Sequence, residues 1–185
     1  GVQTCALPIS GDIVSVKGKD LLLVFDKKQG WLKKYRYRAV DLIDEGSNFK
    51  ANFWRAPNDN DFGANTPDKL KAWKTATQQS KVESLEANLE GKLAHITVRH
   101  ALPEVFGTLT MDYWVNSLGQ MTVKQTFVAD TTQKVEVLPR FGMQWIFPKG
   151  FENVEYYGRG PQENYQDRNF SAHVGHYKQS VDEQY

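Results

Sequence analysis

Residues 93–115 read LAHITVRHALPEVFGTLTMDYWV, and this stretch decides the fold. Apolar side chains recur in it at every second position: Ala94, Ile96 and Val98, then Leu109, Met111, Tyr113 and Val115. Polar side chains occupy the positions between them: His95, Thr97 and Arg99, then Thr108, Thr110 and Asp112. Because successive side chains of a strand point to opposite faces, the pattern predicts two β-strands, each with one buried and one solvated face.

The same alternation continues beyond this stretch, where Met121, Val123 and Phe127 again share one parity. Short separators lie between the apolar segments: KKQG at 27–30, NLEG at 88–91 and NSLG at 116–119. Each ends in a glycine, the residue that most readily takes the positive φ of a tight hairpin. The sequence therefore predicts antiparallel strands joined as a meander, in an all-β sandwich or barrel.

One segment breaks the alternation and predicts a short helix. Thr66–Trp73 reads TPDKLKAW, which offers Thr66 as N-cap, a proline in the first turn and an acidic residue near the positive end of the helix. Leu70 and Trp73, three residues apart, are expected to hold one face of this helix against the sheet.

Length and composition favour one soluble domain. The chain has 185 residues, of which 40% are hydrophobic and 24% charged. Lys and Arg number 23 against 22 Asp and Glu, and no long block of one sign occurs, so neither nucleic acid nor a membrane is an expected partner. The single cysteine, Cys5, excludes an intrachain disulfide. Both a cytoplasmic and a periplasmic bacterial location are consistent with this sequence.

Residues 1–10, GVQTCALPIS, stand apart from the rest. They lack the alternation that begins at Asp12, and they also lack the charged and apolar regions of a secretory signal. We interpret 1–10 as a foreign leader and 11–185 as the domain itself, which we expect to be partial.

The first candidate for chemistry is Phe53–Gly63, FWRAPNDNDFG. Its Asn and Asp side chains are typical of turns in which they hydrogen-bond their own backbone. A calcium loop is disfavoured, because no Glu follows at the spacing that such loops require. The third interpretation is a surface facing a sugar, in which carboxylates and amides bind hydroxyls and Trp54 or Phe62 provides an apolar platform.

The second candidate is Tyr156–Arg168, YYGRGPQENYQDR. Two glycines and a proline within four residues predict a sharply shaped loop, and its acidic and arginine side chains are able to pair. The spacing matches neither a phosphate loop nor a dinucleotide-binding fingerprint. A loop packed against another domain and a ligand contact both remain open for this segment. No metal is assigned to any residue, including His173 and His176.

Three motifs in order, WRAPNDNDFG at 54–63, LPRFG at 138–142 and YYGRGPQENYQDR, resemble the C-terminal or small-chain domain of glycoside hydrolase family 2 β-galactosidases. The resemblance covers about Asp12 to Tyr185, including the segments 21–25 and 31–35. It implies an antiparallel β-supersandwich of galactose-mutarotase type, incomplete here, and a retaining parent enzyme whose two catalytic glutamates lie in a (β/α)₈ barrel absent from this chain. Mg and Na ions, where the family uses them, belong to that barrel. No catalytic residue, metal ligand or cofactor is therefore expected in this chain.

The resemblance assigns two groups of residues. The substrate rim would comprise Asn58, Asp59, Asn60, Asp61 and Gly63, with Gly63 as the hinge of a mobile loop. The structural motif would comprise Arg55, Arg140, Arg159, Glu163, Asn164, Tyr165, Asp167 and Arg168. The implied partners are a galactoside, the catalytic barrel and further copies of the parent enzyme.

Two other classes are weighed against an accessory domain. A stand-alone carbohydrate-binding module is suggested by the 12% aromatic content and by residues 58–61. An aldose epimerase would need a histidine and a glutamate facing one sugar, for which His95, His100 and Glu163 are the candidates. A partial sandwich would expose strand edges and an apolar face, so poor solubility is expected of the chain alone.

Overall fold

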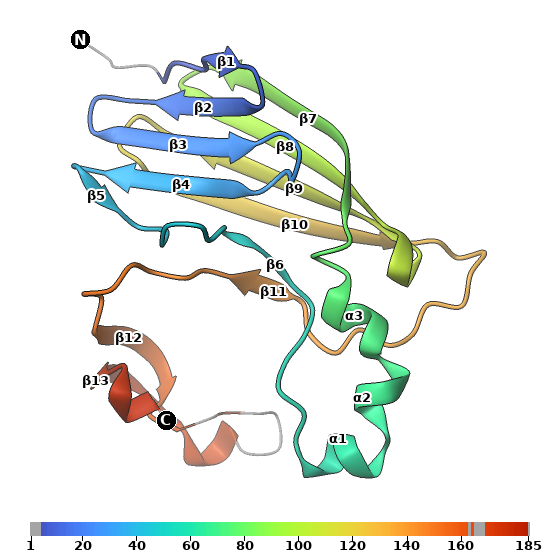
Figure 1. The fold of residues 1–185 in the computed structure, drawn as a ribbon. Helices are drawn as coiled ribbons and strands as arrows, with labels where there is room; N and C mark the ends of the chain where they lie inside the picture. Colours follow the sequence, from blue (N-terminus) through green and yellow to red (C-terminus); the bar gives the residue numbers. More distant parts are fainter. Residues whose placement is uncertain (1–4, 163, 165–168, 185) are drawn as a thin grey trace. The chain divides into compact units, whose positions relative to one another are not determined.

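The computed structural model describes residues 5–162, 164 and 169–184. The chain divides into two compact units, Gly1–Ile146 and Phe147–Tyr185, and each is described by itself (Figure 1). Among the described residues, none of the helices combines the length and the apolar character needed to cross a membrane.

Two antiparallel sheets form the larger part of the first unit. The five-stranded sheet has the order β1-β2-β3-β4-β5, with strands Ile9–Ser10, Ile13–Lys17, Leu21–Asp26, Leu32–Tyr37 and Val40–Asp41. The four-stranded sheet has the order β10-β9-β8-β7, with strands Met121–Ala129, Gly107–Val115, Leu93–Leu102 and Lys81–Glu90. The sheets lie as two layers in Figure 1. The predicted all-β antiparallel fold is confirmed, including the adjacency of β8, β9 and β10.

The core lies between these layers, where the alternation predicted it. Ala94, Ile96 and Val98 on β8 are fully buried, and so are Leu109, Met111, Tyr113 and Val115 on β9. Full burial of a large apolar side chain contributes about 1.5–3 kcal/mol relative to leaving it in water. Aromatic contacts join the two sheets: Phe25 packs edge-on against Tyr113 with ring centroids 4.9 Å apart, and Trp31 stacks on His100 at 4.1 Å.

The hairpin glycines adopt the predicted positive φ: 72° at Gly30, 62° at Gly91 and 85° at Gly119. Gly30 is needed for a second reason, because a Cβ built there would lie 2.4 Å from the His100 ring. The β3–β4 turn is further fixed by the Asp26 carboxylate, which accepts hydrogen bonds from two backbone N–H groups of the turn.

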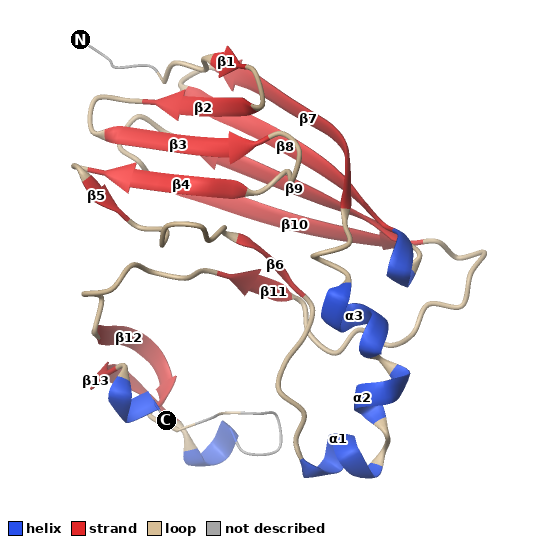
Figure 2. Cartoon of the chain, in the orientation of Figure 1, coloured by secondary structure: helices blue, strands red, loops and turns tan. Residues whose placement is uncertain are grey.

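The remainder of the first unit is a small strand pair and a helical segment. β6, Lys50–Asn52, pairs with β11, Gly142–Gln144. Three short helices follow β6: α1 Asp59–Gly63, α2 Thr66–Lys69 and α3 Lys71–Thr75 (Figure 2). A single turn of 3₁₀ helix, Pro103–Val105, joins β8 to β9.

The expectation of one short helix is therefore corrected to three. The predicted segment is interrupted at Leu70, whose φ of −106° and ψ of 12° leave the helical region. Its N-cap is Asn65 in the left-handed conformation, without a side-chain cap, rather than Thr66. Trp73 is 2% exposed and Leu70 packs on the same core, so the predicted anchoring of this segment is confirmed.

The second unit has little interior. β12, Asn153–Gly160, pairs antiparallel with β13, His173–Ser180, and two 3₁₀ turns, Asn169–Ser171 and Asp182–Gln184, flank β13. Among its described hydrophobic residues only Ala172 is buried. A two-stranded ribbon of this kind is marginally stable alone.

Residues 5–10 take part in the first unit. Ala6 forms a bridge with Lys17, β1 pairs with β2, and Cys5 is 3% exposed within the core. Burial raises the pKa of the Cys5 thiol. The interpretation of residues 1–10 as a foreign leader stays a prediction.

Candidate functional site

The segment between β6 and α1 holds the first predicted motif, and aromatic packing fixes its beginning. Phe53 is 1% exposed and contacts Trp73 and Phe141, with ring centroids 5.5 Å and 6.1 Å away. Trp54 is half-buried and packs against the core. The Trp54 ring is therefore partly covered, whereas Phe62 on α1 is 63% exposed.

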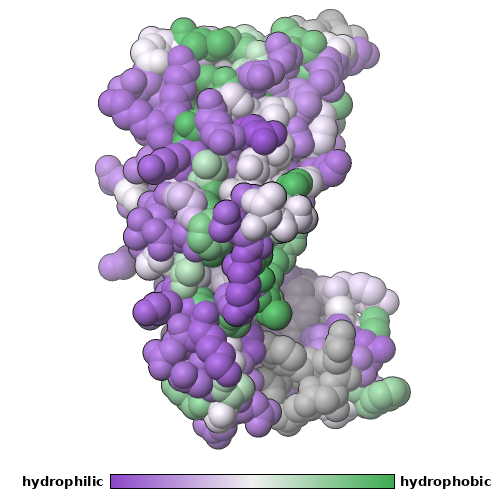
Figure 3. Space-filling view, turned by 90° about the vertical axis from the view of Figure 1, so that its right-hand side faces the viewer, coloured by the Kyte–Doolittle hydropathy of each residue, from purple (hydrophilic) through white to green (hydrophobic). Residues whose placement is uncertain are grey.

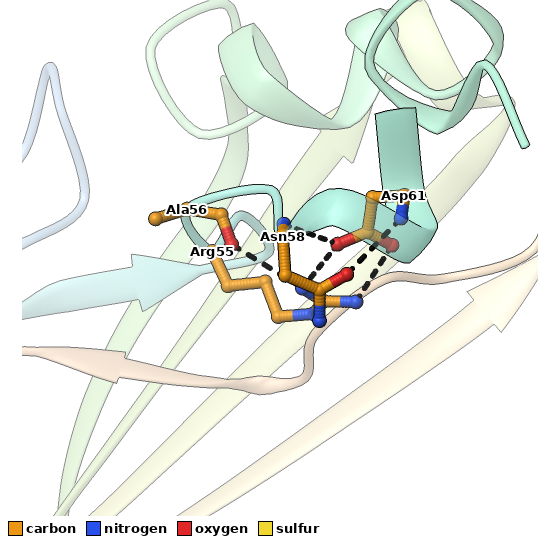
Figure 4. A network of polar contacts seen from close by, with 4 residues as sticks. All are labelled: Arg55, Ala56, Asn58 and Asp61. Atoms are coloured by element: carbon orange, nitrogen blue, oxygen red, sulfur yellow. Dashed lines mark hydrogen bonds and ion pairs between the residues drawn. The ribbon is translucent and has the colours of Figure 1, made fainter. Parts of the chain in front are cut away.

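An arginine and an aspartate close the motif into a loop (Figure 4). Arg55 Nη1 lies 2.6 Å from Asp61 Oδ2, and Nη2 lies 2.9 Å from Oδ1, which is a two-pronged ion pair. Arg55 Nη1 also donates to the Ala56 carbonyl at 3.2 Å. The planar guanidinium matches both carboxylate oxygens, so the pair fixes orientation as well as distance.

Asn58 and Asp61 also start helix α1 through a capping box. The Asn58 side chain accepts from the Asp61 N–H at 3.0 Å, and the Asp61 carboxylate accepts from the Asn58 N–H at 2.9 Å. The hydrogen bond from Arg55, followed by that from the Asn58 backbone, lowers the pKa of Asp61. Asn58 and Asp61 thus use their side-chain oxygens within the loop, in a helix cap rather than in the turn that the sequence suggested.

The other predicted rim residues are accessible. Asp59, Asn60 and Gly63 are exposed on α1 beside Phe62. Among the described residues, no group of three His, Cys, Asp or Glu side chains is arranged to hold a metal ion. The free polar groups of α1 therefore face solvent next to one exposed aromatic ring.

The second motif lies partly outside the described residues. Arg159 Nη1 donates to the carbonyls of Asn169 and Ala172, both at 2.9 Å, and Asn164 donates to the Arg159 carbonyl at 3.3 Å. In the described part, Arg159 thus ties β12 to the segment before β13 through carbonyls rather than carboxylates. The remaining predicted residues of this motif, Glu163, Tyr165, Asp167 and Arg168, lie outside the described residues.

Arg140, from the LPRFG motif, is exposed in the segment that leads into β11. Its neighbour Phe141 stacks on Phe53, so this motif adjoins the first one. Asp61 contacts both Arg55 and Asn58 directly.

The histidines considered for an epimerase lie on opposite faces of β8. His95, on the outer face, contacts Glu90 at 2.6 Å and Asp112 at 3.0 Å and stacks on Trp114. His100 is fully buried on the inner face. Because the two side chains lie on opposite faces of β8, they do not face one sugar together. The glutamate considered for the epimerase, Glu163, lies outside the described residues, so the pairing of a histidine with it stays a prediction.

The surface drawn in Figure 3 is mainly hydrophilic, with smaller hydrophobic areas between the polar side chains. Exposed hydrophobic residues are nevertheless numerous in the second unit, where Tyr157 is 78% and Phe170 92% exposed.

Comparison with known proteins identifies the family of the chain. The family model described as "Beta galactosidase small chain" matches residues 17–185, which include all three motifs. The chain belongs to the β-galactosidase small-chain family. Within this family, the Arg55–Asp61 loop and the segment around Arg159 are parts of the small-chain domain.

Individual relatives give the same result. The chain is 30% identical to a β-galactosidase of Priestia megaterium over 171 residues, which are 92% of this chain and 16% of that protein. It is 30% identical to a β-galactosidase of Streptococcus thermophilus over 176 residues, or 94% and 17%. It is 28% identical to a β-galactosidase of Lactobacillus delbrueckii subsp. bulgaricus over 169 residues, or 91% and 16%. This small-chain domain therefore spans about a sixth of the length of the curated relatives it matches.

Proposed function

We propose that this chain is an accessory domain of a retaining β-galactosidase that hydrolyses terminal β-D-galactosides such as lactose. The match of residues 17–185 to the small-chain family carries this proposal. In it, the barrel of the same protein performs the chemistry, and any Mg or Na ions are bound there. The small-chain domain forms part of the active-site rim and of the scaffold on which copies of the enzyme assemble.

The geometry of α1 supports the rim assignment. The Arg55–Asp61 ion pair and the capping box fix the start of the helix, while Asp59 and Asn60 keep their side chains exposed next to Phe62. A carboxylate and an amide bind sugar hydroxyls, and an aromatic ring packs on the apolar face of a pyranose. A rigid base with a free polar end is what a rim contact requires.

Kinetics of the whole enzyme that carries this chain test the rim. The double variant Asp59→Ala/Asn60→Ala is expected to raise KM for lactose several-fold with little change in kcat, because these groups would hold bound substrate rather than stabilise the transition state. The matched control is Glu86→Ala/Asn88→Ala, which removes one carboxylate and one amide from exposed positions of β7. Equal KM values in the two double variants would contradict the assignment of Asp59 and Asn60 to the substrate rim.

The isolated chain distinguishes an accessory domain from the alternative, a stand-alone carbohydrate-binding module. We expect it to hydrolyse no nitrophenyl galactoside, since the proposal assigns both catalytic glutamates to the barrel. Calorimetric titration with galactose and lactose then separates the two classes. Saturable binding by the chain alone favours the carbohydrate-binding module, whereas the absence of measurable binding favours the accessory domain.

A further inference from the structure

A polar cavity of about 320 Å³ lies in the first unit, apart from the motifs described above. Three connections line it: the β3–β4 turn, the segment that enters β6, and the segment between α3 and β7. The lining residues are Lys28, Gln29, Trp31, Asn48, Lys50, Thr77, Gln78 and Ser80. Its volume lies at the small end of the range for ligand sites, which suits a molecule of monosaccharide size.

Hydrogen bonds hold the three connections in place. The Asp26 carboxylate accepts from the Gln29 N–H at 3.0 Å and fixes the turn. The Asn48 amide donates to the Gln29 side chain at 3.2 Å, which joins the turn to the segment before β6. Thr77 Oγ1 donates to the Ala51 carbonyl at 3.0 Å, which joins the third connection to β6. The cavity is thus shaped by the fold before any ligand arrives.

The charge around the cavity is one-sided. Lys50 is half-buried and, within the described part of the chain, its ammonium has no ion-pair partner. Lys28 contacts Asp12 at 2.9 Å, but both side chains are largely exposed and the pair contributes little. None of the lining residues is acidic. An ammonium group without a counter-charge at a polar cavity favours the binding of an anion.

Trp31 supplies a second unpaired donor. It is only 4% exposed, stacks on His100 and lines the cavity. Its indole N–H has no hydrogen-bond partner among the described residues, unlike those of Trp73 and Trp145, which donate to backbone carbonyls. The indole nitrogen is not among the buried side-chain atoms that lack a partner, so it keeps contact with solvent and is able to donate to a bound ligand.

We propose that this cavity binds a small hydroxylated oxyanion, a sugar that carries a phosphate or carboxylate group. Lys50 binds the anionic group, and Lys28 adds a second positive charge at the mouth. The amides of Gln29, Asn48 and Gln78 bind the hydroxyls. This site is separate from the proposed galactoside rim, so its binding does not depend on the hydrolytic function.

Titration of the chain, alone or within the longer protein, tests the proposal with four probes: glucose 6-phosphate, glucuronate, glucose and inorganic phosphate. Saturation-transfer NMR detects weak binding of each. We expect glucose 6-phosphate, glucuronate or both to bind saturably, with affinity that falls as salt rises. A response to glucose 6-phosphate alone identifies the phosphate ester, and a response to glucuronate alone identifies the carboxylate. Glucose or inorganic phosphate binding as tightly as the sugar anions would overturn the proposal, as would silence from all four probes.

Three variants locate the binding. Lys50→Met keeps the side-chain stem, and Gln78→Glu adds a negative charge at an exposed lining position; each is expected to weaken sugar-anion binding at least ~10-fold. The matched control is Lys124→Met on β10, which makes the same charge change outside the cavity and should alter affinity less than ~2-fold. Because Gln78 is exposed, its variant folds even where Lys50→Met does not. Unchanged affinity in Gln78→Glu would exclude this cavity as the site.

Discussion

His100 is a buried histidine whose protonation opposes folding. It is fully buried against Trp31, and burial lowers its pKa from 6.5 to about 4. Between about pH 6.5 and pH 4, His100 is therefore protonated in the unfolded chain but stays neutral in the folded chain. The free energy of unfolding therefore falls by roughly 3 kcal/mol as the pH decreases from 6.5 to about 4, and this effect of His100 is absent above pH 6.5.

Denaturant unfolding between pH 7.5 and 4.5 measures this effect against His100→Leu, which cannot titrate. The variant is expected to lose less stability across the window than the parent chain. His95 acts in the opposite direction: burial disfavours its charge, but hydrogen bonds with Glu90 and Asp112 outweigh burial and raise its pKa. Its contribution is therefore largest at low pH and is lost as pH rises, and both proteins share it. Parallel pH profiles would contradict the assignment to His100.

Tyr113 carries a second buried group without a partner. Its side chain is fully buried, and its hydroxyl has no hydrogen bond within the described part of the structure. Tyr113→Phe removes an unsatisfied polar atom, so we expect a gain of about 1 kcal/mol in the free energy of unfolding. Tyr35 is the matched control, because its hydroxyl donates to the Gly119 carbonyl and Tyr35→Phe should cost about 1 kcal/mol. A loss from both substitutions in urea unfolding would refute this difference.

The sequence predicts which face of a strand a residue occupies better than what that residue meets there. The parity of Ala94, Ile96 and Val98 extends to His100 and places it inside. His100 stacks on Trp31, which lies 69 residues earlier in the sequence. No local sequence pattern predicts a contact over such a separation. Lys50 was missed as a candidate for the same reason, because its cavity is built from three separate connections.

At the scale of elements, substitution of Gly63 tests whether this glycine is needed for the backbone conformation of α1 or for the motion of a loop. It is the last residue of α1, lies outside the positive-φ region, and an added Cβ would have no neighbour within 4 Å. Gly63→Ala should therefore keep or raise stability, by up to about 1 kcal/mol. If Gly63 is the hinge of a rim loop, the same substitution lowers kcat of the whole enzyme, because it restricts the loop.

Thermal melting of the chain and kcat of the whole enzyme test both parts of this prediction. Gly30→Ala is the contrasting substitution, since it combines a φ of 72° with a close approach to the His100 ring and should destabilise the fold. A Gly63→Ala enzyme that is fully active and more stable would leave this glycine without a hinge role.

The helical segment shows where local signals are ambiguous. Asn and Asp at 58–61 favour both turns and helix caps, because the same side-chain acceptors satisfy backbone N–H groups in either. The Asp61 carboxylate, held by Arg55, resolves the choice in favour of a capping box and α1. Thr66 and Asn65 are likewise both acceptable N-caps, and the left-handed conformation of Asn65 decides between them.

At the scale of the whole molecule, alternation predicts the sandwich but not the division of the chain at residues 146 and 147. β12, NVEYYGRG, and β13, HVGHYKQS, lack the strict apolar alternation of β8 and β9, and their apolar side chains are partly or fully exposed. Periodicity reports which residues are able to share a face, and it does not report what covers that face. Whether the second unit packs against a partner must therefore be inferred from its exposed side chains and not from its strand pattern.

Hydrogen exchange measures how far the stability of the two units differs. β8 and β9 carry fully buried side chains, whereas the second unit buries only Ala172 among its described hydrophobic residues. In the chain alone, amides of β12 and β13 are expected to exchange at least ~10-fold faster than those of β8 and β9, which serve as the internal reference. If other parts of the longer enzyme cover Tyr157, Phe170 and Val174, exchange in β12 and β13 should slow there while the reference amides change little. Equal protection of the two units in the chain alone would mean that the second unit is stable without such a cover.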